Sequence, residues 1–524
     1  MKTSAFLLAL CAGLTLACAG QSEAEPVIDV PEDPDAEVPA EAPDDDAVER
    51  GKGGKFSKAK GRKNGKSGAR TGARTGAGAT TGPASIDVSG MPLAPGAAVD
   101  ANSARVVTKL KTSDCIHTTI TPLVIGDQIV FGTHKQTARG KHAHCNTDNT
   151  PTALFAVSGT SGEARVLMDD VDAEGAPVFA EGVILMPLVG SGGGIASWYQ
   201  GQSNKVRPVK MGMDSAALWD PKAGHLVVGT INPPSPMCQK EPNPNCGVLM
   251  TLNRDGTVKK IINRESGFRA WVAAGPTSDG THYYVGGGSG MDGARERTDT
   301  YACDMVKLDS DLNVLGRYDD GVPGCRDVGK LKSAPIGEMP VTGNSVWAQY
   351  LGATADNTDS VPFIRLNKET MKPICRAEIP APGNRSLSGF YTGPVVDERD
   401  RAYFVSFSSQ GRGLFRVNSD CSYDALYTSQ SGNLSSPALA DDRYVLIAEA
   451  GNLLVIDREN GRVTRHRLGS SAGVTGSPVI HDGGVTVVAD DGTVTTFKDL
   501  GITGYGKAPW PRFRKDNLGG AGAW

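Results

Sequence analysis

A β-rich unit recurs along this 524-residue chain and constrains its fold more than any other feature. The two clearest copies, Pro437–Arg462 and Pro478–Phe497, run from a proline through an apolar stretch, a Gly-containing turn and a second apolar stretch. The same order appears over Pro122–Gly162. Short runs of Val, Ile, Tyr and Thr, broken by Gly, Asp and Asn, indicate strands and not helices. Weaker copies begin near Pro177, Ala216, Pro276, Pro335 and Pro394.

The spacing of the copies predicts the architecture. Successive copies begin 39 to 60 residues apart. A period near 40 residues is typical of a four-stranded propeller blade, and the longer steps indicate loop insertions. A single blade leaves both faces exposed to water, whereas a ring of blades covers them. We therefore predict an all-β, eight-bladed β-propeller over residues 103–524, with seven blades as the alternative.

The two ends of this region are expected to meet. The last unit contains only about three strands before Leu500, one fewer than a blade needs. Residues 104–111 (ARVVTKLK) could supply the missing strand. The first and last parts of the repeat region would then share one blade and close the ring.

Composition excludes several other classes of protein. Charged residues make up 21% of the chain, aromatic residues 6%, and the formal net charge is −4. This balance excludes a protein that coats nucleic acid, a multi-span membrane protein and a coiled coil.

The N-terminus has the features of an export signal. A positively charged start and the apolar run Ala5–Leu16 precede Ala17 and Cys18. Such a start with a small residue before the cut is typical of a secretory signal. A cysteine at this place is typical of bacterial lipoproteins, in which the thiol is acylated and becomes the mature N-terminus. We predict a lipoprotein signal peptide over residues 1–17 and lipid attachment at Cys18.

Two residues near the predicted cut bear on the destination. Thr15 stands where lipoprotein signals prefer Leu, so simple secretion after cleavage near Ala19 is the alternative. Ala19 itself, in place of Asp, resembles the pattern of lipoproteins that reach the outer membrane. No other stretch reaches eighteen apolar residues. We expect an exported outer-membrane lipoprotein, facing the periplasm or the cell surface and attached by its lipid.

The sequence between signal and repeats is charged and poor in large apolar residues. Residues 23–49 contain twelve acids and no base, and residues 50–74 contain ten bases and no acid. Neither block can bury enough apolar surface to offset the entropy of ordering. We predict a disordered acidic then basic tether over residues 18–102. An alternative role for the basic block is binding to an anionic surface such as lipopolysaccharide.

Several segments resemble a known family of repeats. The stretches Ser436–Leu439, Gly451–Arg462 and Gly476–Val479 look like repeats of propellers of the pyrroloquinoline-quinone type, and Pro509–Gly520 resembles a Trp-Pro-x-Phe-Arg segment common in such chains. The likeness extends over most of the repeat region and is strongest near the C-terminus. The family contains quinone-dependent dehydrogenases and non-catalytic lipoproteins such as the propeller subunit of the outer-membrane assembly machine. The resemblance therefore implies a fold and leaves the function open.

The chain departs from the enzymes of that family. Their blades dock a Trp after the Asp-x-x-x-Gly turn, where this chain has Val463–His466. The quinone enzymes also place two adjacent cysteines near the cofactor, and this chain has no adjacent cysteines and no Cys-x-x-Cys-His. We predict no cofactor, and the departures argue against pyrroloquinoline quinone.

Eight cysteines follow Cys18. An even number of cysteines in an exported chain favours disulfides over free thiols or a metal cluster. Eight thiols allow 105 pairings, and pairing of neighbours keeps each bridge within one blade or its insertion. The predicted pairs are Cys115–Cys145, Cys238–Cys246, Cys303–Cys325 and Cys375–Cys421.

Two segments are candidates for metal binding. His117, His134, His142 and His144 lie close in sequence, and His142 and His144 share one side of an extended segment, within reach of a common Zn or Cu ion. The alternative is a polar insertion loop of the first blade. Residues 309–320 begin like a calcium loop but have Val where the sharp turn requires Gly. A hairpin turn between two strands is the favoured interpretation there.

These features predict a non-catalytic, lipid-anchored propeller of the cell envelope that acts as an interaction scaffold for an envelope protein or glycan. We expect no nucleic-acid partner. One alternative is a quinone- or metal-dependent periplasmic oxidoreductase, implied by the family resemblance. Another is a hydrolase or lyase that uses the central channel of the propeller.

Overall fold

The computed structural model describes residues 85–110, 116–118, 121–135, 152–173, 175–188, 194–206, 213, 216–230, 249–262, 271–288, 305–318, 337–350, 360–380, 393–407, 412–429, 434–516 and 518–520. Over these residues the regular structure consists of strands alone. The described part of the chain contains no helix with the length and hydrophobicity that a membrane span requires.

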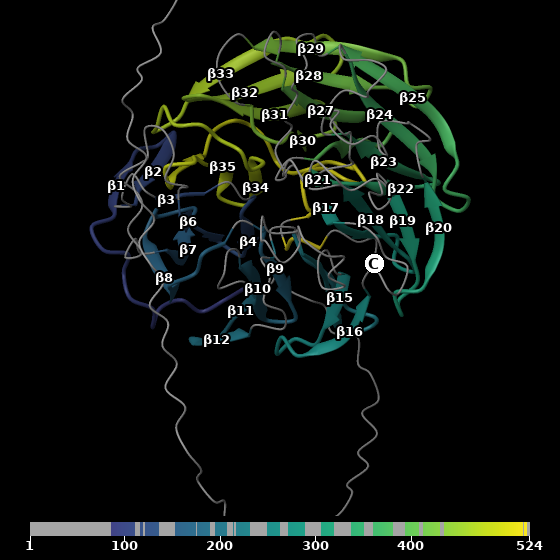
Figure 1. The fold of residues 1–524 in the computed structure, drawn as a ribbon. Helices are drawn as coiled ribbons and strands as arrows, with labels where there is room; N and C mark the ends of the chain where they lie inside the picture. The colour runs from purple at the N-terminus through teal and green to yellow at the C-terminus, as the bar shows by residue number, and fades with distance from the viewer. Residues whose placement is uncertain are drawn as a thin grey trace, which may run out of the picture. The chain divides into compact units, whose positions relative to one another are not determined.

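Eight antiparallel sheets are arranged in a ring around a central axis (Figure 1). We number them as blades 1 to 8 in chain order. Blade 1 contains β4 (Leu123–Ile125), β5 (Gln128–Gly132), β7 (Ala153–Ser158) and β8 (Ala164–Asp169), and blade 2 contains β9 (Val178–Ala180), β10 (Val183–Leu188), β11 (Gly194–Tyr199) and β12 (Gln202–Val206). Blade 3 contains β13 (Leu218–Asp220), β14 (His225–Gly229), β15 (Leu249–Leu252) and β16 (Val258–Ile262), and blade 4 contains β17 (Trp271–Ser278), β18 (Tyr283–Gly288), β19 (Met305–Leu308) and β20 (Val314–Tyr318).

The second half of the chain repeats the arrangement. Blade 5 contains β22 (Val341–Thr342), β23 (Ser345–Gln349), β24 (Ser360–Asn367) and β25 (Pro373–Pro380), and blade 6 contains β26 (Val395–Val396), β27 (Ala402–Phe407), β28 (Arg412–Val417) and β29 (Tyr423–Ser429). Blade 7 contains β30 (Ala438–Ala440), β31 (Tyr444–Glu449), β32 (Asn452–Asp457) and β33 (Val463–Arg467). Blade 8 contains β34 (Val479–His481), β35 (Gly484–Val488), β36 (Thr493–Phe497), β2 (Arg105–Lys109) and β1 (Ala98–Ala101). The prediction of eight blades is confirmed.

Two smaller elements lie outside this plan. Strand β21 (Gly337–Glu338) pairs in parallel with β17 on the inner side of blade 4. Strands β3 (Ile116–His117) and β6 (His134–Lys135) form a separate two-stranded sheet beside blade 1.

Blade 8 is made from both ends of the repeat region, as predicted. Strand β2 pairs antiparallel with β36, so that Arg105 lies opposite Phe497 and Lys109 opposite Thr493. Strand β1 then pairs with the other edge of β2. Because the blade contains sequence from both ends, the ring cannot open at this point without breaking a row of backbone hydrogen bonds.

Most of the repeats begin where the sequence indicated. In six of the eight blades the first strand starts one or two residues after the predicted start, as with β4 after Pro122 and β26 after Pro394. In blade 4, Pro276 lies inside the longer strand β17. In blade 5, the predicted start at Pro335 lies outside the described residues.

Burial changes from the axis outward. Inner strands such as β4 and β30 are buried along their whole length, because neighbouring blades cover both of their faces. The outer strands, such as β12 and β33, are largely exposed and polar. The core therefore lies between blades: Phe363 of blade 5 stacks on Phe404 of blade 6 with ring centroids 4.6 Å apart. Aromatic stacking adds to the apolar area that these faces bury.

The described chain begins inside the predicted tether. Residues 85–97 run along the outer strand of blade 1, where the Ala94 amide donates to the Ala164 carbonyl at 2.8 Å. Side chains of Ile86, Val88 and Met91 pack on the core that blade 1 contributes. The sequence that packs on the propeller thus begins before residue 103.

The turn between the third and fourth strands of a blade packs against the preceding blade. In blade 3 the turn residue Gly256 lies against Val206 of blade 2, and its φ is +83°. Leu312, Met371 and Cys421 hold the same place in blades 4, 5 and 6, also with positive φ. This backbone conformation costs a non-glycine residue about 1 kcal/mol or more. All three side chains are buried, so contact with the blades offsets that strain.

The calcium-like segment is one of these turns. Residues 309–313 connect β19 to β20, and Asp309 accepts backbone hydrogen bonds from Asp311 at 2.9 Å and Asn313 at 2.8 Å. The hairpin interpretation is confirmed.

Candidate functional site

The centre of the ring is occupied by the protein's own C-terminal segment, residues 501–520 (Figure 1). We call this segment the plug. Its side chains Trp510, Arg512, Phe513 and Arg514 are buried to 2% exposure or less. Because central channels hold ligands or catalytic groups in other propellers, the contacts of the plug decide what this axis can do.

The plug enters at the side of the ring where the first and second strands of each blade are joined. There the Asp441 carboxylate, in the turn between β30 and β31, accepts hydrogen bonds from the backbone amides of Thr503 and Gly504, both at 3.0 Å. A carboxylate that accepts two backbone N–H bonds is a strong anchor, because charge-assisted hydrogen bonds exceed neutral ones in strength.

Further along, the plug pairs with the innermost strands. The Val396 amide donates to the Trp510 carbonyl at 2.8 Å, and the Trp510 amide donates back to Val396 at 3.3 Å. The Leu439 amide donates to the Pro511 carbonyl at 2.6 Å. The Arg512 guanidinium donates to the Pro122 carbonyl of blade 1 at 2.7 Å. The plug therefore joins blades 6, 7 and 1 across the axis.

A buried ion pair fixes the next part of the plug. Arg514 and Glu338 of β21 approach to 3.2 Å, and their side chains are 1% and 0% exposed. Trp510 Nε1 donates to the same carboxylate at 3.3 Å, and the Arg514 guanidinium also donates to the Ala217 carbonyl of blade 3. Burial raises the pKa of Glu338, and the Arg514 charge opposes that shift. The hydrogen bonds satisfy the carboxylate, as a charge this deep requires.

Beyond Arg514 the plug reaches blade 2, where the Phe179 amide donates to the Leu518 carbonyl at 3.0 Å. Phe513 packs with Ala176 and Ala216, which precede the first strands of blades 2 and 3. The described plug thus extends from the turns on one side of the ring to the strand starts on the other. The axis is built as a packed core.

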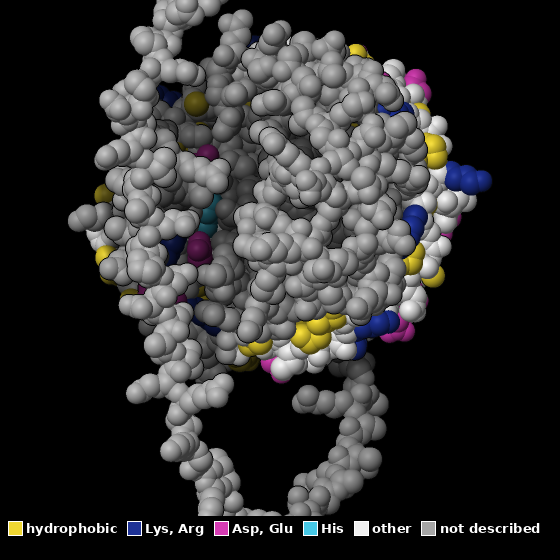
Figure 2. Space-filling model, in the orientation of Figure 1, with side chains coloured by type: hydrophobic (Ala, Val, Ile, Leu, Met, Phe, Trp, Pro, Cys, Tyr) yellow, Lys and Arg dark blue, Asp and Glu magenta, His cyan; other side chains and the backbone are white. Residues whose placement is uncertain are grey.

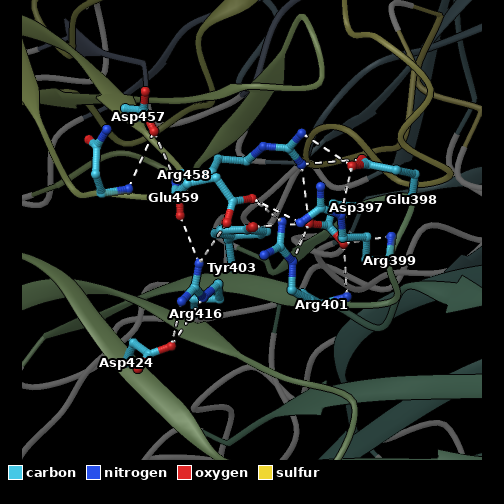
Figure 3. A network of polar contacts seen from close by, with 11 residues as sticks. Asp397, Glu398, Arg399, Arg401, Tyr403, Arg416, Asp424, Asp457, Arg458 and Glu459 are labelled. Carbon is cyan, nitrogen blue, oxygen red and sulfur yellow. Dashed lines mark hydrogen bonds and ion pairs between the residues drawn. The ribbon is translucent and has the colours of Figure 1, made fainter.

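A second polar cluster joins blades 6 and 7 (Figure 3). Asp397, fully buried in the turn after β26, accepts hydrogen bonds from Tyr403 Oη at 2.9 Å and Arg401 Nε at 2.8 Å. Arg458, from the last turn of blade 7, lies 3.2 Å from the same carboxylate and is 1% exposed. Burial raises the pKa of Tyr403. The phenol therefore stays protonated as a donor, which suits a structural link between blades.

This cluster continues to the surface. Glu459, beside Arg458, lies 3.0 Å from Arg401 and 3.2 Å from Arg399. The sequence analysis missed the cluster. A signal was present in the sequence, because neighbouring repeats have charged turns at residues 397–401 and 457–462. Residues of these two turns meet in this polar cluster.

The predicted histidine cluster is only partly described. His117 and His134 are directly opposite each other in the pairing of β3 with β6. His134 is buried, with Nδ1 3.1 Å from the Lys135 carbonyl, and burial lowers its pKa to about 4. His142 and His144 lie outside the described residues. Within the described part of the chain, no three His, Cys, Asp or Glu side chains are grouped to hold a metal.

One predicted cysteine pair can be placed. Cys375 and Cys421 form a disulfide. Cys375 lies on β25 of blade 5 and Cys421 in the turn before β29 of blade 6, so this bridge crosses between blades, and the expectation that each bridge stays within one blade is wrong for it. The packing of each turn on the preceding blade explains the crossing. Cys18, Cys115, Cys145, Cys238, Cys246, Cys303 and Cys325 lie outside the described residues.

The rim of the ring carries exposed hydrophobic side chains. Val258 and Ile261 on β16 are 40% and 38% exposed, and Leu315 on β20 is 53% exposed. Figure 2 shows hydrophobic side chains at the rim near β16, with charged groups beside them. These are outer strands of neighbouring blades, and no described strand pairs with their outer edges.

No family model matches the chain, and no curated protein matches it. Among solved structures it is similar to BamB from Moraxella catarrhalis, with a TM-score of 0.47, 11% identity, and coverage of 76% of this chain and all of that one. It is also similar to the quinohemoprotein alcohol dehydrogenase from Comamonas testosteroni (TM-score 0.48, 12% identity, 75% of each chain) and to the Dos1 propeller (TM-score 0.46, 10% identity, 75% of this chain and 97% of that one).

Proposed function

We propose that this protein is a lipid-anchored β-propeller of the cell envelope that holds a protein or glycan partner on its outer surfaces and catalyses no reaction itself. The observation that carries the proposal is the plug. It fills the axis with the Glu338–Arg514 pair, Trp510 and Phe513, all buried and all engaged with the blades. The surfaces that remain for recognition are the two faces of the ring and its rim.

The connections between strands support one face as the recognition surface. In each antiparallel blade, the link between the second and third strands and the link to the next blade leave from the same side. The longer links, such as residues 231–248 and 319–336, are all of these two kinds. The other side carries short turns such as those after β26 and β30. Segments of variable length on a rigid scaffold are the usual location of binding surfaces.

Anchoring belongs to the same proposal and rests on the N-terminal sequence. Acylation of Cys18 would hold the propeller at a membrane through residues 18–84. A Cys18→Ser variant tests this: the unaltered protein should sediment with the envelope fraction and the variant should be found in the soluble fraction. Equal envelope association of both proteins would contradict anchoring at this cysteine.

Site-specific photo-crosslinking in intact cells tests the scaffold. A photoreactive amino acid is placed at Asn344, Lys222 or Asp482 in short turns on one side, and at Lys135 or Gly288 at strand ends on the other. The expected result is a discrete, saturable adduct from positions on the second side and none from the first. Adducts at neither side, together with substrate turnover by the purified full chain, would overturn the proposal.

A further inference from the structure

Blade 8 has one more outer strand than its neighbour, blade 7. Blade 7 ends at β33, whereas blade 8 continues past β2 to β1 (Figure 1). Since blades pack face to face, the outermost strand of blade 8 has no strand opposite it in blade 7. A groove of about 740 Å³ lies at this place. Its walls are residues 98–100, 105, 107 and 109 of blade 8 and residues 450–452 and 467–471 of blade 7.

Contacts on the two sides of β2 show which side chains face the groove. Val107 lies against Gly469 of blade 7, whereas Val106 and Thr108 lie against Gly162 of blade 1. Because successive side chains of a strand point to opposite faces, Arg105 and Lys109 are on the blade 7 side with Val107. The same face continues onto β1, where Ala98 is paired with Lys109 and Asp100 with Val107.

The groove has a cation at each end, Asp100 between them and buried apolar side chains at its floor. Arg105 donates to the Arg467 carbonyl at 2.8 Å. Within the described part of the chain, neither Arg105 nor Lys109 has a carboxylate within ion-pair distance. Val107 and Leu468 of the floor are buried, and Ala98 at the outer side of the groove is exposed. Arg105 and Lys109 are four residues apart on one strand, a separation of about 14 Å.

The end of β33 at Arg467 lines the groove, so an extended polypeptide that pairs with the outer edge of this strand would enter it. This strand is mostly exposed, and no described strand pairs with its outer edge. A segment added there would become a fifth strand of blade 7 and would lie opposite β1, beside the side chains of β2 that face the groove. Addition of a strand to a free edge supplies main-chain hydrogen bonds, and the facing side chains supply selectivity.

We propose that the groove between blades 7 and 8 binds an extended acidic segment of a partner protein, with Asp or Glu at two positions four residues apart facing Arg105 and Lys109. The residue midway between them faces Val107 and Asp100 and carries no negative charge. This inference rests on the proposed scaffold function and names one partner chemistry for it.

Fluorescence anisotropy with the full-length protein in detergent tests the groove. The probe is a short labelled peptide of alternating Thr and Val, with Glu at two positions four residues apart. A matched peptide carries Lys at both positions. We expect the Glu peptide to bind, the Lys peptide to bind at least about 10-fold more weakly, and salt to weaken binding of the Glu peptide.

Two variants locate the binding. Replacing both cations (Arg105→Glu with Lys109→Glu) should weaken binding of the Glu peptide by about 10-fold or more, since two attractive contacts become repulsive. A control with the same change in net charge, Lys372→Glu with Lys498→Glu, should bind as the unaltered protein does. Ala98→Trp should also block binding by filling the groove without altering charge. Thermal unfolding of each variant establishes that its ring is intact.

Two results would overturn the proposal. One is equal affinity of the peptide for the unaltered protein and for both groove variants. The other is tighter peptide binding after the twelve acids of residues 23–49 are replaced by Asn and Gln, because the chain's own acidic block would then be the occupant. Neither result affects the crosslinking test of the scaffold, which uses positions outside the groove.

Discussion

Arg514 and Glu338 lie 176 residues apart in the sequence and meet as a fully buried ion pair on the axis of the ring. Glu338 belongs to β21, the short parallel strand inside blade 4, and Arg514 belongs to the plug. The pair ties the last element of the chain to its middle. It also places the charges of the axis in a structural role, which is why we look for partners on the outside of the ring.

Removing one partner of this pair should be costly. Arg514→Ala leaves the Glu338 carboxylate buried without its cation, and we expect a loss of about 3–5 kcal/mol in the free energy of unfolding. The matched control is Arg399→Ala, because the Arg399–Glu459 pair is largely exposed and should contribute less than about 1 kcal/mol. Denaturant unfolding of both variants makes the comparison. Similar losses in the two variants would show that the plug does not stabilise the ring.

The hairpin of β35 and β36 in blade 8 depends on a glycine. Gly484 has a φ of +124°, and a Cβ atom built on it would lie 1.9 Å from the Phe497 carbonyl oxygen. Gly484→Ala should therefore destabilise the protein by at least about 3 kcal/mol. Gly224→Ala is the control: φ is +64° but nothing lies within 4 Å, so about 1–2 kcal/mol is expected. Thermal unfolding compares the two, and an unchanged stability of Gly484→Ala would contradict the close approach of Gly484 to Phe497.

The disulfide should hold blades 5 and 6 together. Cys375 and Cys421 are separated by 46 residues, so the loop-entropy account predicts about 4 kcal/mol of stabilisation relative to the reduced chain. Replacing both cysteines with Ala should lower the unfolding free energy by up to about this amount. Peptide mapping without reduction supplies an independent check. A digest in which Cys375 is joined to any cysteine other than Cys421 would refute the bridge between blades.

Acid should act on Asp490 in a distinctive direction. This carboxyl lies between β35 and β36, accepts a hydrogen bond from the Thr475 amide at 3.0 Å, and is buried, which raises its pKa to about 6. The folded state then binds a proton that the unfolded state has released between about pH 4 and pH 6, so this group's contribution to stability falls as pH rises through that range.

The Asp490→Asn variant isolates this contribution. Its unfolding free energy relative to the unaltered protein should increase between pH 4 and pH 7 by roughly 3 kcal/mol, the equivalent of a two-unit shift in pKa. Asp491→Asn, at the more exposed neighbouring position, is the control. If the unfolding free energies of Asp490→Asn and the unaltered protein change with pH in the same way, Asp490 is not the cause of the pH dependence.

Much of the architecture follows from local pattern. Apolar runs after Pro122, Pro394 and Pro437 mark first strands because a strand covered on both faces needs an unbroken apolar stretch. The shortfall of one strand before Leu500 indicated that residues 104–111 could complete blade 8, and β2 does so. These inferences hold because each blade is a local hairpin series whose strands are neighbours in sequence.

The site depended on contacts that local pattern cannot encode. Pro509–Gly520 was recognised only as a resemblance, and nothing in its sequence specifies Glu338, Val396 or Pro122 as its contacts. The pairing of Cys375 with Cys421 was predicted, but its crossing between blades was missed, because only the tertiary structure shows that the turn of one blade packs on the preceding blade.

The sequence by itself determined the all-β class, the number of repeats and the joining of the two ends, because alternation and turn chemistry act over a few residues. Tertiary structure alone decided that the plug fills the axis, that the polar cluster at Asp397 and Arg458 joins blades 6 and 7, and that blade 8 has one more outer strand than blade 7. Those features depend on how the sheets pack against one another. The burial of apolar surface between neighbouring blades, summed over the whole ring, sets the relative positions of the sheets.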